Sequence, residues 1–177
     1  MKKFTVAGAG LAGTEAAWQI AQAGYPVTLV EMKPQKFSPA HKSEYFAELV
    51  CSNSLKASRL ESAAGLLKEE MARLGSLTVP VARNCAVAAG GALAVDRDVF
   101  SKTITEKINS HPNITVGHRV FDKIAPGDDE ILIIATGPLS DGALSVVIKL
   151  LCGACLSFYV SVVPIVTAVS VVMSKAY

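Results

Sequence analysis

A glycine-rich turn near the N-terminus has the residue types and spacing that bind a dinucleotide. Three glycines spaced Gly-x-Gly-x-x-Gly, with small or apolar residues between them, occupy Gly8, Ala9, Gly10, Leu11, Ala12 and Gly13. The first glycine permits a tight turn, the second lets the backbone approach a pyrophosphate, and the third lets a helix pack against a strand. The helix N-terminus adds N–H groups and a positive dipole. The alternative is a glycine-rich turn in an α/β fold that binds no nucleotide.

Two further positions extend this predicted site. Glu31 follows Gly13 by 18 residues at the end of an apolar segment, where a carboxylate accepts hydrogen bonds from an adenosine ribose. Residues 131–137 are expected to form a buried strand that ends in Ala-Thr-Gly, an element that many FAD-binding oxidoreductases share, so Thr136 and Gly137 are predicted to lie near the cofactor. This favours FAD over a nicotinamide dinucleotide. Read alone, the run is equally consistent with an ordinary strand and turn.

The cysteines differ in the reactivity that their sequence context predicts. Cys51 lies between an apolar turn and a polar run that could begin a helix, where the helix dipole would lower a thiol pKa. A buried, unreactive thiol is the alternative at this position. Cys152 and Cys155 form a Cys-x-x-Cys pair with no second pair beside it, and the histidines have no metal-ligand spacing, so no metal site is predicted.

The elements around these residues predict an α/β fold. A strand, a helix and a second strand are expected over Phe4–Ala7, Leu11–Ala23 and Pro26–Met32, which together form a βαβ unit. Residues 33–58 are expected to be irregular, with one short helix around Glu44–Val50. Later elements comprise two amphipathic helices, a glycine turn and two strands, expected at Leu60–Leu74, Asp98–Ile108, Gly90–Gly91, Ile114–Val116 and Glu130–Ala135. The fold class predicted is an incomplete Rossmann-like FAD/NAD(P)-binding domain.

Charge divides the 177-residue chain into two parts. All 15 acidic residues lie at or before Asp141, and the net charge of +2 comes from Lys149 and Lys175, so the weak basicity does not indicate nucleic-acid binding. We therefore expect a dinucleotide-binding part over 1–141 and an apolar tail over 142–177. The uncharged run 150–174 has the length of a membrane span, but its Pro, Gly and β-branched residues argue against one. The N-terminus lacks a signal-peptide core, which predicts a cytoplasmic protein.

Several sequence blocks occur together in the order found in one enzyme family. Beyond the glycine-rich turn they are Glu31–Pro34, Pro39–His41, Phe46–Leu55, Gly65–Met71 and Gly90–Arg97. Over about 140 residues, this pattern resembles the start of the folate- and flavin-dependent tRNA uracil-5 methyltransferases. The resemblance implies reduced FAD and methylenetetrahydrofolate as sources of electrons and carbon, NAD(P)H as a co-substrate, and a T-loop uridine of tRNA as the acceptor. Cys51 matches a catalytic cysteine of the family, with thiolate attack on the uracil ring or proton handling there as its implied work.

The resemblance weakens after Asp141. Family acids are replaced by valine at Val160, Val169 and Val172, and the family's chains are more than twice as long. An incomplete form of the methyltransferase is therefore the leading interpretation. The alternatives are the related flavoprotein family that modifies the wobble uridine of tRNA, and an inactive nucleotide-binding relic. The block around Cys51 and the block Gly90–Arg97 favour the methyltransferase family.

Overall fold

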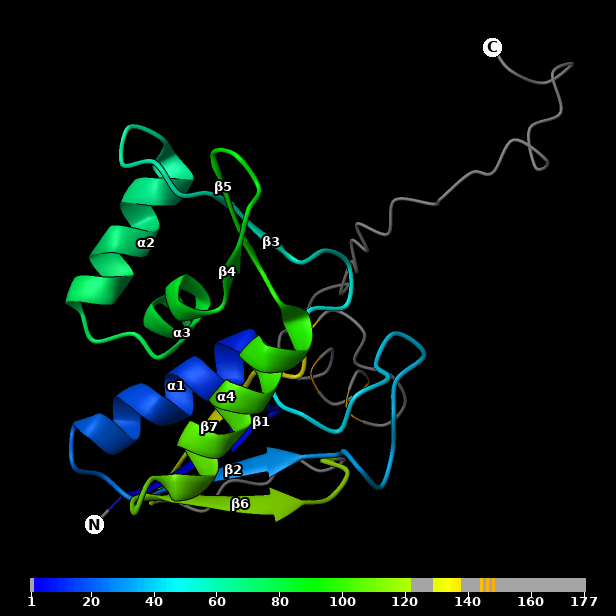
Figure 1. Cartoon of the computed structure of the whole chain (residues 1–177). Coiled ribbons are helices and arrows are strands. Elements are labelled where there is room, and N and C mark those ends of the chain that lie inside the picture. Colours follow the sequence, from blue (N-terminus) through cyan, green and yellow to red (C-terminus); the bar gives the residue numbers. More distant parts are fainter. Residues whose placement is uncertain (1, 122–128, 138–143, 145, 147, 149–177) are drawn as a thin grey trace, which may run out of the picture.

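The computed structural model describes residues 2–121, 129–137, 144, 146 and 148. Within these residues the chain forms two β-sheets and four helices (Figure 1). The strands are β1 (Lys3–Ala7), β2 (Val27–Glu31), β3 (Ser54–Ala57), β4 (Ala86–Val87), β5 (Ala92–Val95), β6 (Ile114–His118) and β7 (Glu130–Ile134). The helices are α1 (Leu11–Gln22), α2 (Ala63–Arg73), α3 (Thr78–Asn84) and α4 (Arg97–Ser110).

The larger sheet is parallel and has the strand order β6-β2-β1-β7. Strand β1 pairs with β2 through the register Val6 to Leu29, and with β7 through Val6 to Ile133. Helix α1 makes the crossover from β1 to β2, which confirms the predicted βαβ unit and the α/β class. Because all four strands run the same way, their carboxyl ends meet at one edge of the sheet, where ligands of open α/β sheets bind.

Helices α1 and α4 cover the same side of the parallel sheet (Figure 1). In α4, Phe100, Ile104 and Ile108 recur every four residues and are fully buried, as one apolar stripe of a helix should be. In α1 the buried residues include Ala17 and Ala21, whose small side chains let the helix approach the strands closely. The packing of α1 and α4 against the sheet forms the core, which holds in place the sheet edge where the glycine-rich turn lies.

A smaller antiparallel sheet, of order β3-β5-β4, packs with α2 and α3 beyond α1 (Figure 1). The turn predicted at Gly90–Gly91 joins β4 to β5, as expected. Helix α2 begins three residues later than predicted, because the Ser62 hydroxyl caps it by accepting from the Gly65 N–H. Its apolar stripe is largely uncovered: Leu67 is 56% exposed, and Leu74, just after the helix, is 77% exposed.

Three sequence-based predictions about local structure are wrong. No helix forms over Glu44–Val50, because the backbone N–H groups of Phe46 and Ala47 bond to distant acceptors on α4 and the glycine-rich turn rather than to the preceding turn. Strand β7 is not buried throughout, since Ile131 and Ile134 are 37% and 38% exposed. Residues 33–58 are not irregular throughout, because β3 forms at 54–57 by pairing with β5. Helix α3 and strands β4 and β5 were not predicted.

The predictions for the apolar tail 142–177, including Cys152, Cys155 and the run 150–174, fall almost wholly outside the described residues. Among the residues that are described, no helix combines the length and apolarity that crossing a membrane would need. The same residues contain no group of three or more His, Cys, Asp or Glu side chains placed to hold a metal ion.

Candidate functional site

The glycine-rich turn connects β1 to α1, and each of its glycines has a distinct steric setting. Gly8 has φ +97°, and a Cβ there would lie 2.6 Å from the Ala135 carbonyl oxygen. A Cβ at Gly13 would lie 1.7 Å from the Gly8 carbonyl oxygen. Neither position can accept a side chain without movement of the backbone. At Gly10, by contrast, a Cβ would have no heavy atom of the described chain within 4 Å.

The open space at Gly10 lies at the N-terminus of α1. Gly10 is the N-cap residue, and the Thr14 N–H donates to its carbonyl oxygen at 3.0 Å. The N–H groups of Leu11, Ala12 and Gly13 precede that bond and have no acceptor within the helix. Together with the helix dipole, these groups can stabilise an anion placed against Gly10. The turn therefore has the open backbone and the donors that a pyrophosphate group requires.

Glu31 lies at the carboxyl end of β2 and is only 5% exposed. One carboxylate oxygen, Oε2, accepts a hydrogen bond from the Ala9 N–H at 2.7 Å, and the other, Oε1, accepts one from the Lys33 N–H at 3.0 Å. The Glu31 carboxylate thus connects the end of β2 to the glycine-rich turn. Each oxygen keeps a second lone pair, so hydrogen bonding to a ribose stays a prediction.

The end of β7 lies directly beside the glycine-rich turn. The Ala135 N–H donates to the Ala7 carbonyl oxygen at 2.7 Å, and a Cβ on Gly8 would lie 2.9 Å from the Cα of Thr136. Gly137 then turns the chain with φ +76°. The structure therefore brings Thr136 and Gly137 to the same edge as Gly8, the neighbourhood predicted from sequence.

Cys51 is exposed and lies in a bend just before β3. The polar run after it forms a strand rather than a helix, so the predicted helix dipole at this thiol is absent. The segment that carries Cys51 is nevertheless anchored near the glycine-rich turn, because the Ala47 N–H donates to the Ala9 carbonyl oxygen at 2.8 Å. The Arg97 guanidinium donates to the Leu49 carbonyl oxygen at 3.1 Å, which gives that arginine a positioning role that its sequence block did not reveal.

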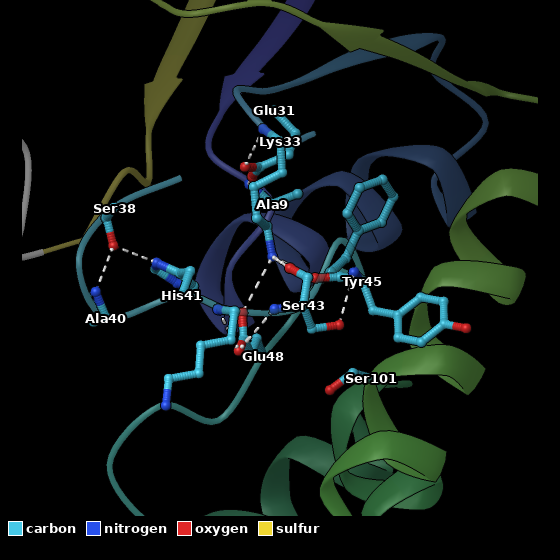
Figure 2. Close-up of polar contacts among 12 residues, drawn as sticks. Ala9, Glu31, Lys33, Ser38, Ala40, His41, Ser43, Tyr45, Glu48 and Ser101 are labelled. Atoms are coloured by element: carbon cyan, nitrogen blue, oxygen red, sulfur yellow. Dashed lines mark hydrogen bonds and ion pairs between the residues drawn. The ribbon is translucent and has the colours of Figure 1, made fainter. Parts of the chain in front are cut away.

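A polar cluster that the sequence did not predict lies beside Glu31 and contains Lys33, His41 and Glu48 (Figure 2). Lys33 is 3% exposed and faces Glu48, with its Nζ 3.6 Å from Glu48 Oε2. His41 lies in the same loop, and its Nδ1 is 2.6 Å from the Ser38 hydroxyl oxygen. Burial first, and then the positive charge of Lys33, lower the pKa of His41 below 6.5, against the opposing effect of the acidic residues. Lys33, His41 and Glu48 lie in the sequence blocks named above, but no spacing links them, because they come from an aperiodic loop.

An apolar groove of about 930 Å³ runs along α1, bordered by α2, α3, β3 and β5. Leu11 and Ala12 line one part of it, so the groove adjoins the glycine-rich turn. Leu67 and Met71 of α2 line the opposite wall. Neither Glu31 nor Cys51 borders this groove, which therefore meets the candidate site only at the start of α1.

Comparisons with known proteins agree on one family. The family model described as "Glucose inhibited division protein A" matches residues 3–176. Similar curated proteins include methylenetetrahydrofolate--tRNA-(uracil-5-)-methyltransferases TrmFO of Enterococcus faecalis and Pelotomaculum thermopropionicum, each 54% identical over 177 residues. The Aquifex aeolicus protein of that name is 52% identical. The alignments cover 99% of this chain but only 40%, 40% and 39% of those relatives.

A solved structure supports the fold. Aquifex aeolicus GidA, in its form II crystal, superposes with a TM-score of 0.57 at 14% identity, over 72% of this chain and 21% of that one. At this identity the likeness shows the α/β architecture and nothing finer. The chain spans about 40% of the length of the curated relatives that it matches.

Proposed function

Because the chain belongs to the glucose inhibited division protein A family, we propose that it is the dinucleotide-binding part of a methylenetetrahydrofolate- and FAD-dependent tRNA (uracil-5-)-methyltransferase. Two observations together support the proposal. One is 54% identity to proteins of that name. The other is an open, donor-rich glycine turn at the carboxyl edge of a parallel sheet. We propose residues 1–141 as the FAD-binding part and 142–177 as its apolar continuation.

The residues present fit an FAD pyrophosphate. Gly10 leaves open space where any side chain would intrude, and the first turn of α1 presents backbone N–H donors to that space. Gly8, Ala9, Gly10, Leu11, Ala12 and Gly13 would hold the pyrophosphate. Glu31 would hold the ribose, and Thr136 and Gly137 would border the same cofactor. When bound, FAD supplies the electrons that the transferred carbon needs to reach the methyl level.

Cys51 is the proposed catalytic residue of this chain. Its thiol is exposed, so it is open to a tRNA base brought to the carboxyl edge of the sheet. As a thiolate, the sulfur would attack the uracil ring or take part in proton movement there. The relatives' names supply the substrates, tRNA and methylenetetrahydrofolate. To these we add NAD(P)H as the co-substrate that would reduce the flavin, and the cytoplasm as the location.

The portion of the relatives that this chain does not span is expected to be needed for methyl transfer, so a chimera provides the test. Residues 1–141 would replace the aligned segment of the Enterococcus faecalis relative, and labelled methylenetetrahydrofolate, NADPH or NADH, and a tRNA transcript would be supplied. We expect label in the T-loop uridine, and none with Cys51→Ala in the chimera. A folded, flavin-containing chimera that transfers no label beside an active parent would refute the proposal and favour the inactive relic.

A further inference from the structure

Lys33 has an unusual environment for a lysine side chain. It is 3% exposed, and an ammonium group so placed must have each of its three donors engaged. Its Nζ donates to the carbonyl oxygens of Ser43 at 3.0 Å and Tyr45 at 2.5 Å, and the third direction faces Glu48 Oε2 at 3.6 Å. All three partners belong to the loop that leads to Cys51. Lys33 therefore ties the end of β2 to that loop.

Glu48 organises the same loop from within. Its Oε1 accepts hydrogen bonds from the backbone N–H groups of Lys42 at 3.0 Å and Ser43 at 3.2 Å. Its Oε2 is buried and has no hydrogen-bond partner in the described part of the chain, so the Lys33 ammonium is the charge that compensates it. Removing one member of such a pair leaves the other buried and uncompensated, which costs far more than the pair contributes.

The backbone of Lys33 connects this pair to the glycine-rich turn (Figure 2). The Lys33 N–H donates to one oxygen of Glu31, whose other oxygen accepts from the Ala9 N–H. The circuit closes where the Ala47 N–H donates to the Ala9 carbonyl oxygen. Both polar groups of Ala9 are thereby engaged, one directly by the Cys51 loop and one through Glu31 and Lys33.

We propose that Lys33 is a positioning residue, which holds the segment carrying Cys51 at a set place against the glycine-rich turn. Glu48 is three residues before Cys51, so the Lys33 anchor acts close to the thiol. Occupancy of the glycine-rich turn is then communicated to Cys51 through Ala9, Glu31 and Lys33. The inference rests on the proposed function for the chemistry of Cys51, and on the contacts above for the positioning itself.

Amide hydrogen exchange in the 177-residue chain tests the positioning directly. In Lys33→Met and Glu48→Gln we expect the Ala47 N–H to exchange at least tenfold faster than in the wild type. Lys33→Arg, which keeps the charge and the donors, should remain within threefold. Lys42→Met is the matched control, because Lys42 lies in the same loop with an exposed side chain, and it should change exchange less than twofold. Should Lys33→Met fail to fold, the near-isosteric Glu48→Gln decides the outcome.

The reactivity of Cys51 tests the coupling. Alkylation by iodoacetamide, followed on the Cys51 peptide by mass spectrometry, should change at least threefold on addition of FAD to the wild type and to Lys42→Met. In a yellow, folded Lys33→Met it should change less than 1.5-fold. Wild-type exchange or a wild-type FAD response in Lys33→Met would overturn the inference. If the wild type takes up no FAD, the proposed function fails, and Ala47 exchange alone decides the role of Lys33.

Discussion

Alanine substitutions in the glycine-rich turn should separate folding from cofactor binding. Gly10 has φ −73° and open space around its Cβ position, so alanine fits the folded chain there. An N-cap alanine costs up to about 1 kcal/mol of stability. Its methyl group, however, would occupy the space proposed for the pyrophosphate. We therefore expect Gly10→Ala to fold normally and to bind FAD at least tenfold more weakly, a loss of about 1.4 kcal/mol.

Gly13→Ala should show the opposite order of effects. Its Cβ would lie 1.7 Å from the Gly8 carbonyl oxygen, so the turn and α1 must move apart by more than an ordinary adjustment. Overpacking of this kind costs roughly 3 kcal/mol or more. For a chain of this length, that lowers Tm by about 6 to 12 °C, at roughly 2 to 4 °C per kcal/mol. The primary defect of Gly13→Ala is therefore expected in stability.

Circular dichroism melts and FAD titrations of the wild type, Gly10→Ala and Gly13→Ala would measure the effects on stability and on FAD binding. Gly91→Ala is the matched control, because its Cβ would meet only the Arg59 side chain, at 3.5 Å, in the turn between β4 and β5. It should leave both Tm and FAD affinity near the wild-type values. Undiminished FAD affinity in Gly10→Ala would refute the placement of the pyrophosphate, and wild-type stability in Gly13→Ala would refute the packing of the turn.

Substitutions of Glu15, His41, Asp96 and Cys51 give four further predictions. Burial raises the pKa of Glu15, but hydrogen bonds, chiefly from Thr78, outweigh it and hold that pKa below 4.5. The contribution of the Glu15 carboxylate to stability is therefore complete above pH 4.5 and is lost as the pH falls through the lowered pKa of Glu15. Glu15→Gln should cost about 1 to 2 kcal/mol of folding stability at pH 7. The stability of this variant should also depend less on pH below 4.5, as acid unfolding curves would show. Burial chiefly lowers the pKa of His41, so the wild type should lose stability as pH falls below 6.5 while His41→Gln should not, as chemical denaturation between pH 5 and 7 would show. Asp96→Ala removes the N-cap of α4 and should lower Tm by about 2 to 4 °C for a loss near 1 kcal/mol. Cys51→Ala should leave Tm and FAD uptake unchanged, because the side chain is exposed; a fall in FAD uptake would place the thiol in the cofactor pocket instead.

The βαβ unit was predictable because its determinants are local. The apolar runs of β1 and β2, the helix formers of α1 and Gly24, which has φ +85° just after the helix, each express themselves within a few residues. The capping of α4 is equally local, since the Asp96 carboxylate accepts from the N–H groups of Asp98 and Val99. Elements of this kind depend little on the rest of the fold.

The loop that carries Cys51 was not predictable, because distant partners determine it. The Phe46 N–H donates to the Thr105 hydroxyl, 59 residues away, and Ala47 adopts φ +50° to reach the glycine-rich turn. Those bonds replace the helix that local propensity favours over the same residues. Lys33 and Glu48 are likewise joined only by the folded path of the loop, so no spacing in the sequence reveals them.

The exposure of several apolar side chains was also not predictable from the sequence. Leu67 and Ile134 have the periodicity of core residues but are 56% and 38% exposed. Parallel sheets and their helices are normally covered on both faces. Periodicity identifies which side of a helix or strand is apolar, but it does not show whether another element covers that side.

The visible absorbance spectrum of the purified 177-residue chain, recorded after incubation with FAD and removal of the excess, shows whether the glycine-rich turn holds FAD. We expect a yellow protein with the two-banded spectrum of oxidised flavin at one equivalent per chain, and a colourless one for Gly10→Ala treated in the same way. A wild-type chain that melts cooperatively but remains colourless would contradict this expectation, because the glycine-rich turn would then be folded and yet not hold FAD.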